Sequence, residues 1–134
     1  MHIIDMKQLD DWLIDAVMFE HSSEELHAYV VGLAKAFVLG KARDFSNESL
    51  VLAFIKASDE HKFQSYQQIG DWSLWTMGFM TKHVKEKNIV ESIGRSSYFK
   101  CWSMLRGSWV VFEELADTLP TISEKLRSFR SKAR

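Results

Sequence analysis

Proline, glycine and cysteine are scarce in this chain. Its 134 residues include one proline, six glycines and one cysteine. Turns between short strands depend on proline and glycine, so their scarcity favours a few long helices over a many-stranded sheet. The lone Cys101 excludes an internal disulfide and is typical of a protein in a reducing compartment.

Strong net charge and long apolar runs are also absent. The formal net charge is −1, so no global field draws the protein to nucleic acid or to an anionic membrane. Unbroken apolar runs are far shorter than the roughly 20 residues that a transmembrane helix needs. The first residues, MHIIDMKQLDDW, have neither the basic nor the apolar part of a signal peptide. We therefore expect a cytoplasmic protein without membrane contact.

Apolar residues recur at the three- and four-residue spacing of helix faces, and no segment alternates as a strand does. We predict an all-α, single-domain bundle of five or six helices over residues 1–134. A first helix is expected over residues 5–20.

Capping residues divide the next part of the chain. Ser22 and Glu25 form a predicted capping box for a second helix, which Gly40 closes. Ser46 or Asn47 is expected to cap a third helix. One side of this helix is expected to carry Leu50, Val51, Phe54 and Ile55.

Two longer helices are expected in the middle of the chain. Asp59 is the expected cap of the fourth helix, and the sequence leaves open whether that helix continues through Gly70. A fifth helix is expected over residues 89–117, with Trp109 facing inward and a bend at Gly94 or Gly107.

Pro120 is expected to end the fifth helix, because proline cannot continue a helix interior. Thr121 and Glu124 then form a capping box for a last helix. Basic residues dominate 121–134, whereas acidic residues dominate 1–25. We expect these two helices to lie side by side. The alternative, contact of the basic tail with nucleic acid, is less expected because no aromatic residues interleave the cations.

The stretch GDWSLWTMGFM, followed by a later G-x-x-x-Y, resembles a group of small bacterial helical proteins without assigned activity. Their pattern is G-D-x-x-L-x-x-x-G-F, and the resemblance covers roughly residues 63–105. It implies an all-helical fold in which the second motif lies on a helix beside the first, and it implies no reaction. The segment MTKHVKEKN departs from the more apolar stretch usual in that group. The matching positions are Gly70, Asp71, Leu74, Gly78, Phe79, Gly94 and Tyr98.

Asp71 is the candidate acid of this stretch. We expect a structural role, as a helix cap or as the hydrogen-bond partner of the Tyr98 hydroxyl, because no second acid or base lies near it in sequence. Gly70, Gly78 and Gly94 would let two helix backbones approach closely. The alternative is a chemical role for Asp71 in a pocket.

Metal and nucleophile signals are weak. Glu24 and His27 share a helix face as an E-x-x-H pair, but a di-iron site needs two such motifs, so we expect no metal and no cofactor. Cys101 has the basic neighbour Lys100, yet a buried structural cysteine is the commoner case. The segment GRSSYFK, with Arg95, would hold a phosphate only if it opened a helix.

Five tryptophans is a high number for this length, and Trp72 and Trp75 lie on a different side of their helix from Leu74. Such residues favour a covered surface: a second subunit, or a small apolar ligand. We expect a binding or interaction protein rather than an enzyme, acting as a homodimer with an aromatic-lined interface or groove. The alternatives are a ligand-binding protein or enzyme with a pocket near Asp71 and Tyr98, and a nucleic-acid accessory factor. The candidate pocket or interface residues are Asp71, Trp72, Trp75, Phe79, Tyr98 and Trp102.

Overall fold

The computed structural model describes residues 23–79, 86–106 and 109–132, and for Phe79 and residues 125–132 it describes the backbone alone. This part of the chain contains five helices and no strand. The prediction of an all-α bundle is confirmed. The expected helix over residues 5–20 lies outside the described residues. The helices are α2 (Glu24–Val38), α3 (Leu50–Glu60), α4 (Phe63–Phe79), α5 (Lys87–Met104) and α6 (Val110–Lys132).

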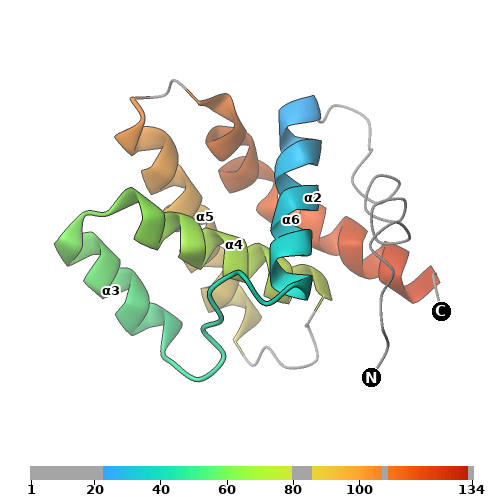
Figure 1. Ribbon diagram of the computed structural model, residues 1–134, viewed down its shortest axis with the longest axis horizontal. Coiled ribbons are helices and arrows are strands. Elements are labelled where there is room, and N and C mark those ends of the chain that lie inside the picture. Colours follow the sequence, from blue (N-terminus) through green and yellow to red (C-terminus); the bar gives the residue numbers. More distant parts are fainter. Residues whose placement is uncertain (1–22, 80–85, 107–108, 133–134) are drawn as a thin grey trace.

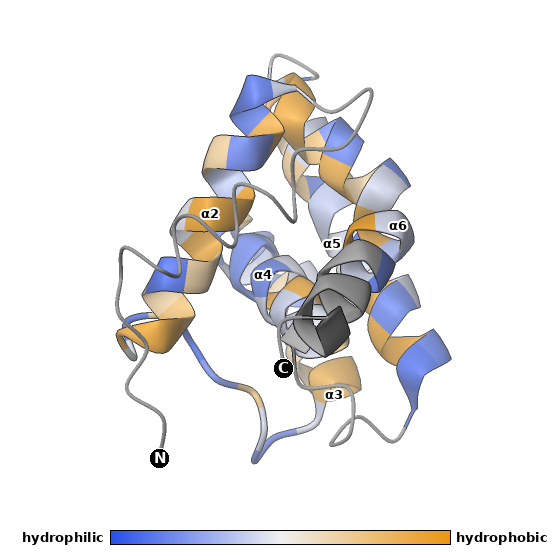
Figure 2. Ribbon diagram, turned by 90° about the vertical axis from the view of Figure 1, so that its right-hand side faces the viewer, coloured by the Kyte–Doolittle hydropathy of each residue, from blue (hydrophilic) through white to orange (hydrophobic). Residues whose placement is uncertain are grey.

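Helix α4 lies at the centre of the bundle and contacts all four of the other described helices (Figure 1). Its most extensive contacts are with α5, which also packs along α6. Helix α2 crosses α4 and α6, and α3 lies at the opposite edge of the molecule. Along α2, hydrophobic and hydrophilic segments alternate as in an amphipathic helix (Figure 2). No helix in the described ranges is both long and apolar enough to cross a bilayer.

Serine caps begin α2 and α3, although not at the predicted residues. Ser23 is the N-cap of α2, and its hydroxyl accepts a hydrogen bond from the Leu26 N–H at 3.1 Å. The expected cap residue, Ser22, lies outside the described residues. Ser49 caps α3 by accepting from the Leu52 N–H at 3.2 Å, so the prediction of Ser46 or Asn47 is wrong. Several adjacent residues can serve as caps, and only packing selects one of them.

Helix α4 runs without a break through Gly70, which answers the question that the sequence left open. Asp59 does not cap it. Asp59 lies inside α3, which ends at Glu60; the C-cap residue His61 takes the left-handed conformation with φ 54°. One left-handed residue is enough to end a helix and turn the chain. Helix α4 then begins at Phe63.

The single helix predicted over residues 89–117 is wrong, since α5 and α6 are separate. Helix α5 ends at Met104, and Arg106 has a left-handed φ of 54°. The two helices then pack against each other, which one straight helix could not do. Trp109, expected to face inward, is 48% exposed at the start of α6. A break within a continuous apolar pattern is decided by tertiary contacts, which periodicity does not report.

Pro120 lies inside α6, so the predicted helix end and the capping box at Thr121 are wrong. A proline at this position has no N–H to donate to the carbonyl of Ala116, four residues earlier. The side chain of Arg95 on α5 supplies the missing donor, with its Nε 2.9 Å from the Ala116 oxygen. A neighbouring helix therefore satisfies the carbonyl that proline leaves open.

Glycines make the contact between α4 and α5 possible. A Cβ atom on Gly70 would lie 2.7 Å from the Tyr98 ring, and one on Gly94 would lie 2.6 Å from the Cβ of Ser73. Neither helix could approach the other this closely with a larger residue at these positions. The expected close approach at Gly70 and Gly94 is confirmed.

Candidate functional site

Asp71 joins three helices through one carboxylate oxygen. Its Oδ1 accepts hydrogen bonds from the hydroxyl of Tyr98 on α5 at 2.8 Å and from the hydroxyl of Tyr29 on α2 at 2.5 Å. The side-chain amide of Gln67 donates in turn to the Tyr29 oxygen at 3.1 Å. The predicted pairing of Asp71 with Tyr98 is confirmed. Tyr29 was not expected in this network, because it lies 42 residues from Asp71 in the chain.

The electrostatics of this network are set mainly by burial. Burial raises the pKa of Asp71 to about 6, although the hydrogen bonds from Tyr29 and Tyr98 act in the opposite direction. Burial, and then the adjacent carboxylate, hold the pKa of both tyrosines well above their usual range. Both phenols therefore keep their protons and remain donors to Asp71.

Aromatic rings enclose the phenolic groups. The Tyr29 ring meets the Tyr98 ring edge to face at 6.3 Å and the Phe112 ring at 5.6 Å. Tyr98 has no exposed surface. Asp71 is thus held by two donors among packed rings, an arrangement that stabilises the meeting of α2, α4 and α5.

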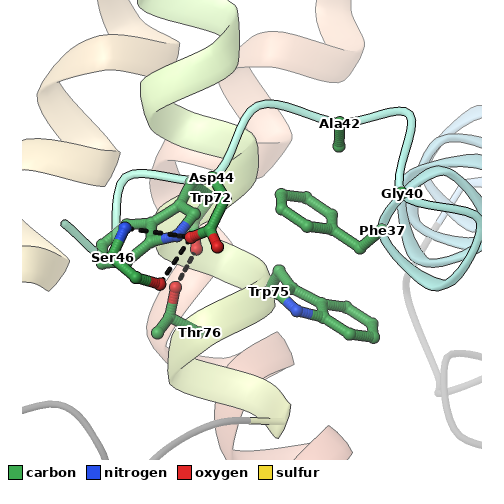
Figure 3. Close-up of a pocket in the computed structure, with 8 residues that line it drawn as sticks. All are labelled: Phe37, Gly40, Ala42, Asp44, Ser46, Trp72, Trp75 and Thr76. Atoms are coloured by element: carbon green, nitrogen blue, oxygen red, sulfur yellow. Dashed lines mark hydrogen bonds between the residues drawn. The ribbon is translucent and has the colours of Figure 1, made fainter.

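A pocket of about 640 Å³ lies on another side of α4, between that helix, the end of α2 and the loop over residues 40–46 (Figure 3). This volume is within the usual range for small-molecule sites, about 300–1,000 Å³. Neither Asp71 nor Tyr98 lines it. Its walls include Phe37 from α2, Asp44 and Ser46 from the loop, and Trp72, Trp75 and Thr76 from α4.

One wall of the pocket is polar. The Asp44 Oδ1 accepts three hydrogen bonds: from the Ser46 hydroxyl at 2.5 Å, the Ser46 N–H at 2.9 Å and the Trp72 indole N–H at 3.0 Å. These bonds, that of the Ser46 hydroxyl first, lower the pKa of Asp44. The carboxylate is therefore ionised, and the indole bond ties the loop to α4.

The facing wall is aromatic. The rings of Phe37 and Trp75 stack in parallel, with centroids 5.1 Å apart and planes 3° apart. On the polar side, the ring of Trp72 meets Phe45 edge to face at 6.0 Å. Figure 3 shows the stacked pair on one side of the pocket and Asp44 with Trp72 on the other.

The six candidate pocket or interface residues therefore do not form one site. Asp71 and Tyr98 form the polar network, whereas Trp72 and Trp75 line the pocket. Trp102 lies on α5 beside Phe99, with ring centroids 5.5 Å apart, and its buried indole N–H has no hydrogen-bond partner in the described structure. The side chain of Phe79 lies outside the described residues.

The other chemical candidates do not form a site within the described part of the chain. No group of three or more His, Cys, Asp or Glu side chains there could hold a metal ion, and Glu24 is exposed at the start of α2. Burial, with a smaller effect of Asp71, raises the pKa of Cys101 to about 12, so this thiol is not activated. Arg95 lies within α5, not at its start. The basic side chains at 125–134 are outside the described residues.

The pocket residues Phe37 and Asp44 were not expected from the sequence. Phe37 follows the apolar spacing of its helix, which is typical of a core residue, and Asp44 lies in a polar segment between two helices. The segment ARDFSNES does contain an Asp two residues before a serine, a spacing at which aspartate accepts from a following backbone N–H. Comparison of the chain with models of protein families, with curated proteins and with solved structures finds no match.

Proposed function

We propose that this is a non-catalytic helical binding protein that acts as a homodimer through the outer face of α3. The observation that carries the proposal is a set of three exposed aliphatic side chains on one side of that helix: Val51 is 44% exposed, Leu52 66% and Ile55 53%. Val51 and Ile55 were predicted to lie on one side of the helix with Leu50, yet Leu50 is buried and the other two are on the surface. Apolar side chains grouped on a surface favour association.

The position of α3 supports this use. It packs on α4 and α5 at the edge of the bundle, and its outer side meets no other described helix (Figure 1). Val51 and Ile55 are one helical turn apart, with Leu52 beside them, so the three form a continuous aliphatic surface. A second copy would meet it with the same apolar surface, as a two-fold interface requires.

The proposal that the protein is not catalytic rests on the contacts of Asp71. Its Oδ1 is engaged by two tyrosine hydroxyls, and both tyrosines have raised pKa values. A proton acceptor held by two permanent donors is suited to structure rather than to turnover. The single reduced Cys101 supports a cytoplasmic location.

The oligomeric state tests this proposal. We expect light scattering after size exclusion to give twice the chain mass of 15.6 kDa. The double variant Leu52→Lys/Ile55→Lys should give a monomer with an unchanged helical spectrum. Val110→Lys, at a 52% exposed position on α6, is the matched control and should remain a dimer. A monomeric wild-type protein at high concentration would refute the proposal.

A second candidate function is supported by the pocket between α2 and α4. Its volume, its aromatic walls and its single carboxylate suit a small molecule. This shifts the ligand-binding alternative away from Asp71 and Tyr98. Binding is expected to change the indole N–H resonances of Trp72 and Trp75, and unchanged resonances across a panel of small probes would exclude it.

A further inference from the structure

We infer that the pocket formed by Phe37, Asp44, Ser46, Trp72 and Trp75 binds a small organic cation that carries an alkylated ammonium group. This inference rests on the second candidate function, that the pocket takes a small molecule, and it names the chemical class of that molecule. It is independent of the proposed dimer, since α3 contributes none of these residues.

The aromatic walls provide the first argument. Phe37 and Trp75 stack with centroids 5.1 Å apart, so each covers one face of the other and only the outer faces of this pair are left for a cation. Trp72 lies across the pocket from them. Aromatic rings attract cations through the negative face of the π system, and tryptophan does so most strongly. Methyl groups on nitrogen spread the positive charge over an apolar surface, which suits such walls better than a compact, strongly hydrated ion does.

The charge of the pocket provides the second argument. Asp44 is its only ionisable lining side chain in the described structure. All three hydrogen bonds that the described residues give this carboxylate fall on Oδ1, so Oδ2 keeps its capacity to accept. An anionic ligand would meet this negative charge without a compensating cation.

The nearest basic side chain does not neutralise Asp44. Arg43 precedes it in the loop, but the Arg43 guanidinium lies 4.3 Å above the ring of Phe45 and 3.3 Å from the carboxylate of Glu48. The positive charge of Arg43 is therefore paired with Glu48 and the Phe45 ring, outside the pocket lining. The same contacts fix the loop, because they hold the residues on both sides of Asp44.

The size of the pocket provides the third argument. A trimethylammonium group fills only part of about 640 Å³, so the remaining volume can hold the body of a small molecule. The Ser46 and Thr76 hydroxyls both donate to protein oxygens, Asp44 Oδ1 and the Trp72 carbonyl. Their oxygens remain available as acceptors, which again suits a ligand that donates or carries positive charge.

A pair of probes tests the inference. Choline and its neutral carbon isostere 3,3-dimethylbutan-1-ol have the same shape and differ in charge. Each would be titrated while the indole N–H resonances of Trp72 and Trp75 are followed, with assignments from Trp→Phe variants. We expect choline to bind about fivefold more tightly, the factor given by an attraction of about 1 kcal/mol between charges 4 Å apart in water.

Two variants locate the effect. Asp44→Asn keeps an acceptor for Ser46 and Trp72 and should reduce the preference for choline, leaving only the part that the aromatic rings contribute. Asp59→Asn, an exposed carboxylate on α3, is its control and should change nothing. Phe37→Leu should weaken choline about two- to fivefold, whereas Phe54→Leu, at a partly buried phenylalanine outside the pocket, should not.

The possible outcomes distinguish this inference from the small-molecule function on which it rests. Equal binding of both probes would overturn the cation specificity and leave the small-molecule pocket in place. A reduced choline preference in Asp59→Asn as well as in Asp44→Asn would also overturn it, because the charge effect would then be non-specific. If neither probe moves the two indole resonances, the inference fails, and the small-molecule function fails with it when the wider panel of probes also leaves them unchanged.

Discussion

Two sides of helix α4 differ sharply in how they are packed. On the side facing α5, Gly70 and Ser73 leave no room for even one more carbon atom beside Tyr98 and Gly94. On the side facing α2 and the loop over 40–46, Trp72 and Trp75 border an open volume of about 640 Å³. Ser73 and Trp72 are neighbours in the chain, yet they lie in the tightest and the most open surroundings of the helix.

The difference teaches which features of the stretch GDWSLWTM are structural. Small residues let two backbones meet, and the polar groups between them are paired, as Asp71 is with Tyr98. Large rings on the other side keep α2 at a distance and leave space that side chains do not fill. The tight side stabilises the contact between α4 and α5, and the open side has room for the ligand that we propose.

Substitution of glycine should show the largest effect. Gly94→Ala places a Cβ 2.6 Å from the Ser73 Cβ and 3.0 Å from Leu119. Ser73 cannot move freely, because its hydroxyl donates to the Ile69 carbonyl at 2.8 Å. We expect a loss of about 2 kcal/mol in the free energy of unfolding, measured in urea.

Gly32→Ala is the matched control. Gly32 lies inside α2, and a Cβ there would have no atom within 4 Å. Replacing an unhindered helical glycine by alanine should raise stability by about 1 kcal/mol. The two alanine variants should therefore shift stability in opposite directions. A gain in both would mean that α4 and α5 are not in close contact at Gly94.

Protonation of Asp71 should give the next largest effect. Because the pKa of Asp71 is raised to about 6 in the folded protein, the folded state binds this proton more tightly than the unfolded chain does. The stability that results is present in full below about pH 4 and is lost as the pH rises through about 6.

The variant Asp71→Asn cannot titrate and so serves as the reference. We expect the stability of the wild-type protein relative to Asp71→Asn to fall by about 2 kcal/mol between pH 4 and pH 7, measured by urea unfolding at each pH. Asp59→Asn controls for the loss of one negative charge. A constant difference between wild type and Asp71→Asn over this range would contradict the buried position of the carboxylate.

Much of the tight side could be predicted from the sequence. Helical spacing placed Gly70, Asp71 and Leu74 on one helix and Gly94 and Tyr98 on another, and glycines on apolar helices indicate a close crossing. A buried tyrosine needs a partner, and Asp71 was the nearest suitable acceptor in the motif. These inferences need only local spacing and the rule that buried polar groups are paired.

The remaining features depend on contacts between distant residues. Pro120 predicts a helix end because proline has no N–H to donate within a helix. It lies inside α6, where Arg95 from another helix donates to the Ala116 carbonyl that Pro120 leaves open. Tyr29 reaches Asp71 because α2 crosses α4, which no periodicity encodes. The pocket needs the loop over 40–46 to fold back onto Trp72, whose indole N–H donates to Asp44 and whose ring packs on Phe45.

The smallest effect concerns two indole N–H groups in opposite situations. Trp72 donates to the exposed Asp44, whereas the buried N–H of Trp102 has no partner in the described structure. Trp72→Phe removes a formed hydrogen bond and should lower the free energy of unfolding by under about 1 kcal/mol. Hydrogen exchange in the loop over 40–46 should become faster. Trp102→Phe removes a buried donor that is already unpaired, so its smaller ring should cost little beyond lost packing, and the loop should be unaffected. If Trp72→Phe leaves exchange in the loop unchanged, the indole bond does not hold the pocket wall, and Ser46 alone must position Asp44.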